Sequence, residues 1–209
     1  MKIVLISDTH LLHDQMKHDI PDGDVLVHCG DGLNTGSADD FWKFKLWFNS
    51  LPHKNKIYVP GNHDEFFEKV LSTTRSEMPD VHILVDQEVV IERVKFYGSP
   101  WTPTFFDWYF MQDEEDLPKY WDNIPDDTDI LLTHGPPRNF LDMNEEGEHC
   151  GSESLRKRVF EVSPKYHVFG HIHEMGSGSE EVDGIKFINA SICTRRYKPV
   201  NPPIVLELN

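Results

Sequence analysis

Side chains that can bind metal ions follow five short apolar segments of this chain. They are carboxylates, one amide and imidazoles: Asp8, His10, Asp31, Asn62, His134, His171 and His173. Three carboxylate or amide groups and four imidazoles exceed what one ion needs, so the set indicates two divalent cations that share a bridging carboxylate. Mixed Asp and His ligation fits Mn, Fe, Zn, Co or Ni better than Ca or Mg.

The stretch from Gly61 to Asp64, with the sequence Gly-Asn-His-Asp, is the centre of this pattern. It follows the apolar run 56–59, and the Pro60–Gly61 pair predicts a turn there. Taken alone, the stretch is equally well explained as a polar turn, because Asn and Asp are common turn residues. Five such strand ends in one chain are not easily ascribed to chance. In open α/β sheets, ligands bind at the carboxyl ends of the strands.

Residue spacing predicts how several of these side chains point. Asp8 and His10 are two residues apart, as are His171 and His173. In an extended segment, residues two apart lie on the same side. Asp31 stands between two glycines, which allow the backbone to bend and to direct the carboxylate toward the same edge.

Hydrophobic periodicity predicts an α/β fold that presents these residues at strand ends. Strands are expected at 3–6, 25–28, 56–59, 81–91, 93–97, 129–133, 166–169, 179–182, 185–189 and 204–208. Helices are expected at 37–49, 65–73 and 152–162, with a short one at 14–18, and Ser37 and Ser152 are the expected N-caps. The chain shows no repeat, linker or low-complexity tract, so residues 1–209 are expected to form a single domain.

Composition limits the possible partners. The formal net charge of −16 argues against a broad surface for long nucleic acid. A small phosphorylated substrate remains compatible, because bound cations can reverse the local field. Three widely spaced cysteines and the short apolar run at the N-terminus predict a protein of the reducing cytoplasm, without a signal peptide. No apolar stretch approaches the roughly 20 residues of a membrane span.

The ordered motifs resemble those of the calcineurin-like metallophosphoesterases. They are Asp8-x-His10, Gly30-Asp31, the Gly61–Asp64 stretch, Thr133-His134-Gly135 and Gly170-His171-Ile172-His173. Further segments, such as 133–137, 188–191 and 201–203, resemble the metallophosphoesterase-domain-containing subfamily. In animal members of that subfamily the position of His171 is often Gly, whereas the histidine here completes the set.

This resemblance implies a four-layer α/β/β/α sandwich with the metal site at the carboxyl ends of the strands. It assigns Asp8, His10, Asp31 and His173 to one metal. It assigns Asp31, Asn62, His134 and His171 to the other, with Asp31 bridging. His63 would remain unliganded near the leaving-group oxygen, and Asp64 would hydrogen-bond and orient His63.

The implied activity is two-metal hydrolysis of small phosphodiesters. Hydroxide held between the cations, with Mn or Fe favoured, would attack phosphorus, and His63 would act as general acid. The subfamily suggests 2′,3′- or 3′,5′-cyclic AMP or GMP as substrate. Asn62, His63, Trp101 and Arg138 are the expected substrate contacts, although Trp101 is at least as well explained by packing over a loop.

Other functions remain open on the sequence alone. The chain could be a metal-dependent nuclease, a phosphomonoesterase, or a nucleotide-binding or scaffold protein with weak turnover. A one-metal hydrolase would leave His134 or His171 dispensable. Both a monomer and a homodimer are compatible with the sequence.

Overall fold

The first of two large β-sheets combines the first four strands of the chain with its last strand. The computed structural model describes residues 1–208. Strands of this sheet follow the order β13-β1-β2-β3-β4. Their bounds are β1 Lys2–Ile6, β2 Val25–His28, β3 Asn55–Tyr58, β4 Val81–Ile83 and β13 Ile204–Glu207. β1 to β4 run parallel, whereas β13 pairs antiparallel with β1 and places Glu207 opposite Lys2.

The second sheet has the order β11-β12-β10-β9-β6-β5. Its strands are β5 Gln87–Ile91, β6 Val94–Ser99, β9 Ile130–Thr133, β10 Tyr166–Phe169, β11 Ser179–Val182 and β12 Ile185–Asn189. The four central strands are parallel, and the antiparallel β11 and β5 form the edges. A small pair, β7 Thr102–Pro103 and β8 Met111–Gln112, follows β6.

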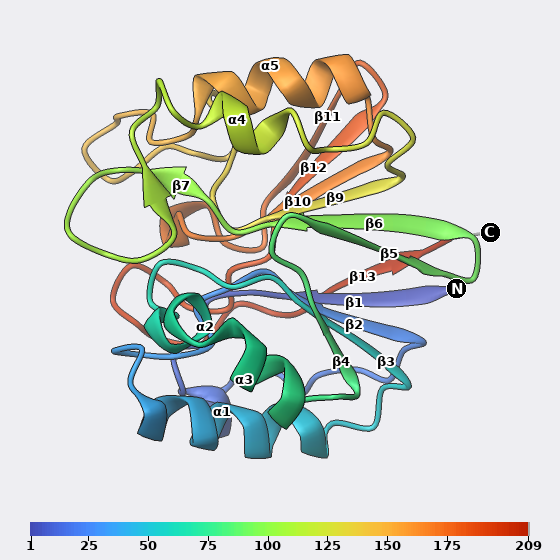
Figure 1. The fold of residues 1–209 in the computed structure, drawn as a ribbon, viewed down its shortest axis with the longest axis vertical. Coiled ribbons are helices and arrows are strands. Elements are labelled where there is room, and N and C mark those ends of the chain that lie inside the picture. Colours follow the sequence, from blue (N-terminus) through green and yellow to red (C-terminus); the bar gives the residue numbers. More distant parts are fainter. Residues whose placement is uncertain (209) are drawn as a thin grey trace.

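Alternating side chains of the strands build three apolar layers. Ile3 and Leu5 of β1 pack between the sheets with residues such as Ile130 and Val168. Val4 points the other way, into the layer under the first helices. A third layer lies between the second sheet and the last helices. Figure 1 shows the resulting order of helices, sheet, sheet and helices, which confirms the α/β/β/α sandwich.

Helices cover the two outer faces. α1 Ala38–Ser50, α2 Glu65–Lys69 and α3 Leu71–Glu77 lie on the first sheet, and α4 Pro118–Trp121 and α5 Glu153–Val162 lie on the second (Figure 1). The Ser37 hydroxyl accepts a hydrogen bond from the Asp40 amide, and that of Ser152 accepts one from the Leu155 amide. Both N-caps therefore confirm the prediction. Within residues 1–208, no helix is long and apolar enough to cross a bilayer.

Three predicted elements differ from the structure. The helix expected at 65–73 breaks at Val70, whose φ of −137° and ψ of 46° lie outside the helical region, so α2 and α3 are separate. The strand expected at 81–91 is interrupted near Asp86, which has a φ of 51°. The helix expected at 14–18 is only the 3₁₀ turn η1 His13–Gln15, and a second 3₁₀ turn, η2 His173–Met175, follows β10.

Candidate metal centre

The residues singled out in the sequence meet where both sheets end. β1, β2 and β3 of the first sheet, and β9 and β10 of the second, run away from the termini and end at one side of the sandwich (Figure 1). The segments that follow these strands carry all seven predicted ligands. Three groups of converging ligand atoms result. Two match the predicted ligand sets, Asp8 with His10 and His173, and Asp31 with His134 and His171, and the third joins His63 to His10 and Asp31.

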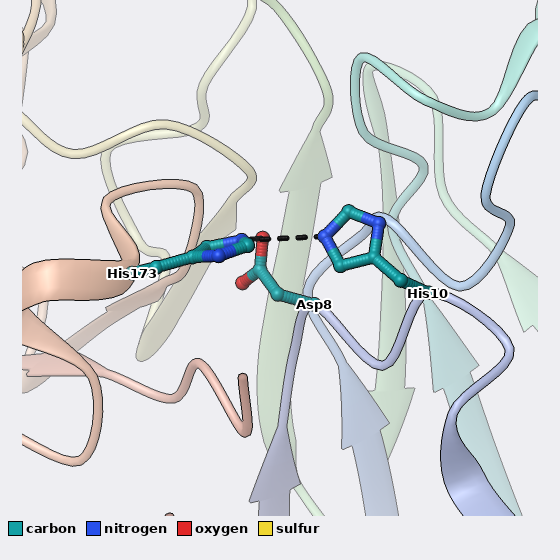
Figure 2. A group of neighbouring side chains, drawn as sticks. All are labelled: Asp8, His10 and His173. Carbon is teal, nitrogen blue, oxygen red and sulfur yellow. Dashed lines mark hydrogen bonds and ion pairs between the residues drawn. The ribbon is translucent and has the colours of Figure 1, made fainter. Parts of the chain in front are cut away.

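The first group joins the end of β1 to the end of β10. The Nε2 atoms of His10 and His173 lie 3.2 Å apart, and His173 Nε2 lies 3.2 Å from Asp8 Oδ1. Figure 2 shows the two imidazoles pointing toward Asp8 from opposite sides. Asp8 is fully buried, and its Oδ2 accepts a hydrogen bond of 2.6 Å from Ser191 Oγ.

The second group is centred on Asp31. Its Oδ2 lies 3.4 Å from His134 Nε2 and 3.9 Å from His10 Nε2, so this carboxylate stands between the two groups. Asn62 joins the group, because its Oδ1 lies 2.9 Å from His134 Nε2. His171 completes it, with its ring centroid 5.0 Å from that of His134. The role of Asp31 as a bridge between two cations stays a prediction.

The backbone around the centre is more contorted than an extended segment. Asp8, His10, Asp31 and His171 have φ values of 54°, 44°, 55° and 67°. Such left-handed non-glycine residues cost about 1–3 kcal/mol each and cluster at functional sites. The expected same-side arrangement of His171 and His173 is therefore wrong. Because His171 is left-handed and His173 begins a 3₁₀ turn, the two side chains join different groups. His171 lies with Asp31, and His173 lies with Asp8.

Two glycines allow the strand ends to approach. A Cβ atom on Gly30 would lie 2.4 Å from His134 Nδ1, and one on Gly61 would lie 2.4 Å from Asp31 Oδ1. Both distances are too short for any side chain. The sequence predicts only that Gly30 lets the backbone bend. The structure shows in addition that the absence of a side chain on Gly30 leaves room for His134, which follows a strand of the other sheet.

Hydrogen bonds orient the histidines toward the centre. His134 Nδ1 donates to the Cys29 carbonyl oxygen at 2.8 Å, and His173 Nδ1 donates to that of Thr194 at 3.1 Å. Each bond places the proton on Nδ1 and leaves Nε2 to face the carboxylates. A second partner of this kind is typical of histidines that ligate metals.

These residues fit two divalent cations. Nitrogen and oxygen atoms from both sheets converge, and within each group they lie within 4.8 Å of one another. The Nδ1 atoms of His134 and His173 are already held by backbone carbonyl oxygens. The donor set of imidazoles, carboxylates and one amide suits transition metals.

The electrostatics of the centre keep its carboxylates ionised. Burial alone would raise the pKa of Asp31, but the neighbouring His134 and His63 hold it well below the usual range. Burial likewise opposes ionisation of Asp8, and the hydrogen bond and charge of His173 overcome it and lower its pKa. Burial lowers the pKa of His10 to about 4, so its imidazole is neutral at pH 7. Burial opposes protonation of His134, but the charge of Asp31 raises its pKa to about 9, and Asp8 likewise raises the pKa of His173. Binding of cations would therefore displace protons from these two imidazoles.

Asp64 differs from its expected role. Its carboxylate accepts hydrogen bonds from Tyr58 Oη at 2.7 Å and from the amides of Gly61, Asp31 and Leu33 at 2.6, 2.9 and 3.1 Å. The predicted hydrogen bond between Asp64 and His63 is therefore wrong. Asp64 instead joins the turn after β2 to the turn after β3. His63 Nδ1 donates to the Asn34 carbonyl oxygen at 2.6 Å, a partner that the sequence reading missed.

An open cleft of about 670 Å³ leads to the centre. Besides metal-centre residues, it is lined by aromatic, acidic and basic side chains, including Phe105, Trp108, Glu146, Glu174, Arg195 and Tyr197. Sequence reasoning missed these residues. The aromatic run at 105–110 was visible as a signal, but nothing in the sequence placed it beside the strand ends.

Trp101 and Arg138 do not line this cleft. Trp101 Nε1 donates to Asp86 Oδ2 at 2.8 Å, and its ring stacks on Tyr120 with centroids 4.0 Å apart. Arg138 donates to the His149 carbonyl oxygen at 3.3 Å. The expected substrate contacts of these two residues are not supported, and packing over a loop explains Trp101.

Comparisons with known proteins agree with this geometry. The family model described as calcineurin-like phosphoesterase matches residues 1–175. Metallophosphoesterase domain-containing protein 1 of Homo sapiens is 37% identical over 233 residues, covering 99% of this chain and 71% of that protein. A UPF0046 protein of Caenorhabditis elegans is 36% identical, covering 100% and 75%. The structure of an archaeal phosphodiesterase aligns with a TM-score of 0.53 at 20% identity, covering 99% and 93%, which supports the fold.

Proposed function

This chain belongs to the calcineurin-like phosphoesterase family and is a metal-dependent phosphoric ester hydrolase, and we propose that it hydrolyses small phosphodiesters with two bound cations. The observation that carries the proposal is the position of Asp31 between two histidine-containing groups. Asp8, His10, Asp31 and His173 would hold one cation. Asp31, Asn62, His134 and His171 would hold the other. For this mixed set of nitrogen and oxygen ligands, the favoured metals are Mn and Fe.

When bound, such cations supply a water of lowered pKa as nucleophile and compensate charge on the phosphoryl oxygens. The chain itself supplies a proton donor. His63 lines the cleft beside Asn62, and its Nδ1 proton is committed to the Asn34 carbonyl oxygen. Nε2 is the remaining ring atom that can carry a proton to the leaving oxygen, a contribution typically worth about 10²–10⁴-fold in rate.

The cleft favours a small monoanionic substrate. Glu146 and Glu174 stand on its walls, and the chain has a net charge of −16. Acidic walls repel a dianionic monoester more than a monoanionic diester. A volume of about 670 Å³ with aromatic walls can admit a nucleoside-sized group, which supports cyclic AMP or GMP as candidates. We further propose a cytoplasmic location, since Cys29, Cys150 and Cys193 form no disulfide.

Hydrolysis of bis-p-nitrophenyl phosphate tests the function. The protein is stripped with chelator and then supplied separately with Mn²⁺, Fe²⁺, Ni²⁺, Zn²⁺ or Mg²⁺. We expect turnover to return with a transition metal and to be lost in Asn62→Ala. Asn49→Ala, the same change at an exposed site on α1, should behave as wild type. Folded protein without turnover under any metal would refute the proposal. Cyclic nucleotides are then the next substrates to test.

A further inference from the structure

An aromatic loop, residues 104–110 between β7 and β8, lies across the strand ends of both sheets. The Tyr109 amide donates to the Asn62 carbonyl oxygen at 3.2 Å, which ties the loop to the turn after β3. At its other side, the Phe105 ring lies 5.4 Å from that of His171, which follows β10. The base of the loop is closed by the Thr102 amide bonding to the Phe110 carbonyl at 2.9 Å.

Trp108 in this loop covers the imidazole of His63. The two ring centroids are 4.2 Å apart, with an angle of 33° between the planes. The two rings are therefore in close contact with their planes tilted. Trp108 is 38% exposed, so the contact is not simply a by-product of a packed core. The backbone of the neighbouring Tyr109 is held beside the turn after β3 by its hydrogen bond to Asn62.

Other contacts restrain His63 from different directions. Nδ1 donates to the Asn34 carbonyl oxygen, and the backbone amide donates to Asp31 Oδ1 at 2.8 Å. The edge of His10 meets the ring at 4.8 Å and 85°. Removing Trp108 would leave one face of the imidazole open to the cleft. The ring could then rotate away from the orientation that these contacts favour.

We propose that Trp108 is a positioning residue that holds the His63 imidazole in the orientation from which Nε2 delivers a proton to the leaving group. The inference rests on the proposed function, because it assigns Trp108 a part in that reaction. As the P–O bond to the leaving group breaks, the proton on Nε2 passes to the leaving oxygen, so that the N–H bond breaks, an O–H bond forms and the imidazolium becomes a neutral imidazole. Trp108 contributes only by restricting where the ring can lie.

This role predicts a loss that depends on the leaving group. Proton donation matters most when the departing oxygen is basic, so phenol needs it more than 4-nitrophenol. With methyl phenyl phosphate, Trp108→Ala should lower kcat roughly 10-fold, against less than about 3-fold with methyl 4-nitrophenyl phosphate. Trp108→Phe keeps an aromatic face and should recover most of the loss.

A double-mutant cycle separates positioning from substrate contact. If Trp108 acts through His63, adding Trp108→Ala to His63→Ala should lower kcat no further. Trp42→Ala, which removes a similarly exposed tryptophan on α1, is the matched control and should change neither kcat nor KM. Additive losses, equal losses with both esters, or a rise in KM alone would show that Trp108 contacts the substrate and would overturn the proposal.

A measurement without turnover tests the contact itself. In metal-free protein, the Trp108 ring should shift a His63 ring-proton resonance upfield in the NMR spectrum, and His63→Ala identifies that signal. The shift should disappear in Trp108→Ala and persist in Trp42→Ala. No upfield shift in the wild type would overturn the proposal. If the shift is present but the wild type hydrolyses neither ester with any metal, the proposed function fails and the catalytic role of Trp108 fails with it.

Discussion

His63 lies beside both metal-binding groups, and one of its ring nitrogens lies within 4.8 Å of ligand atoms of His10 and Asp31. Its Nδ1 is bonded to the Asn34 carbonyl oxygen, and its ring lies between Trp108 and His10. We expect His63→Ala to keep both cations while kcat for a phenyl diester falls about 10²–10⁴-fold. Metal content by elemental analysis and kcat with phenyl and nitrophenyl esters check this. His82→Ala, at an exposed position of β4, is the control. Loss of one cation would instead make His63 a ligand with His10 and Asp31.

Residue types could predict much of this centre but not all of its contacts. Asp8, Asp31 and His134 were recognisable because each follows a buried strand, and the structure brings them together. Two of the four partners of Asp64 were not predictable, because they are the backbone amides of Asp31 and Leu33 in a different turn. Which amides lie near a carboxylate depends on the backbone path, and left-handed φ values at ordinary residues such as Asp31 leave no trace in the sequence.

At the scale of elements, Asp64 joins the turn after β2 to the turn after β3. Its carboxylate accepts four hydrogen bonds and is fully buried. In Asp64→Ala, three amides and the Tyr58 hydroxyl lose their acceptor inside the protein. We expect the free energy of unfolding to fall by about 3 kcal/mol or more. Urea unfolding of the chelator-treated protein measures this, with exposed Asp80→Ala as control. A loss below about 1 kcal/mol would contradict the structural role.

Element boundaries were predictable where local chemistry sets them. Ser37 and Ser152 marked the starts of α1 and α5, because the N-cap bond is made within one turn. The break at Val70 between α2 and α3 carries no such signal, since neither Gly nor Pro is present there. The aromatic loop was visible as a run of rings, yet its bond to Asn62 links residues far apart in sequence.

At the scale of the molecule, the metal centre depends on the two sheets lying together. Asp8 and His10 follow β1 of the first sheet, whereas His173 follows β10 of the second. Apolar runs showed that the strands are buried but could not show which sheet each one joins. The four-layer order therefore came from the family resemblance, and alternating burial along β1 explains it physically.

The stability of the whole fold should depend on buried neutral histidines outside the centre. His167 of β10 is fully buried, and burial lowers its pKa to about 3. The Thr133 hydroxyl donates to the Gly135 carbonyl oxygen and so accepts from His167 Nε2 at 2.9 Å. Nδ1 therefore carries no proton, and it has no partner among residues 1–208. Protonating Nδ1 would bury an unpaired donor and a charge.

Because the folded pKa lies below the unfolded value near 6.5, the unfolded chain binds the extra proton first as pH falls. The stability from neutral His167 is complete above about pH 6.5 and is lost progressively down to pH 3. Between pH 7 and 5, metal-free wild type should lose about 2 kcal/mol more than His167→Gln, which cannot titrate. Urea unfolding at each pH measures the difference, and exposed His82→Gln should track the wild type. Parallel pH curves for wild type and His167→Gln would show that His167 titrates normally in the folded protein.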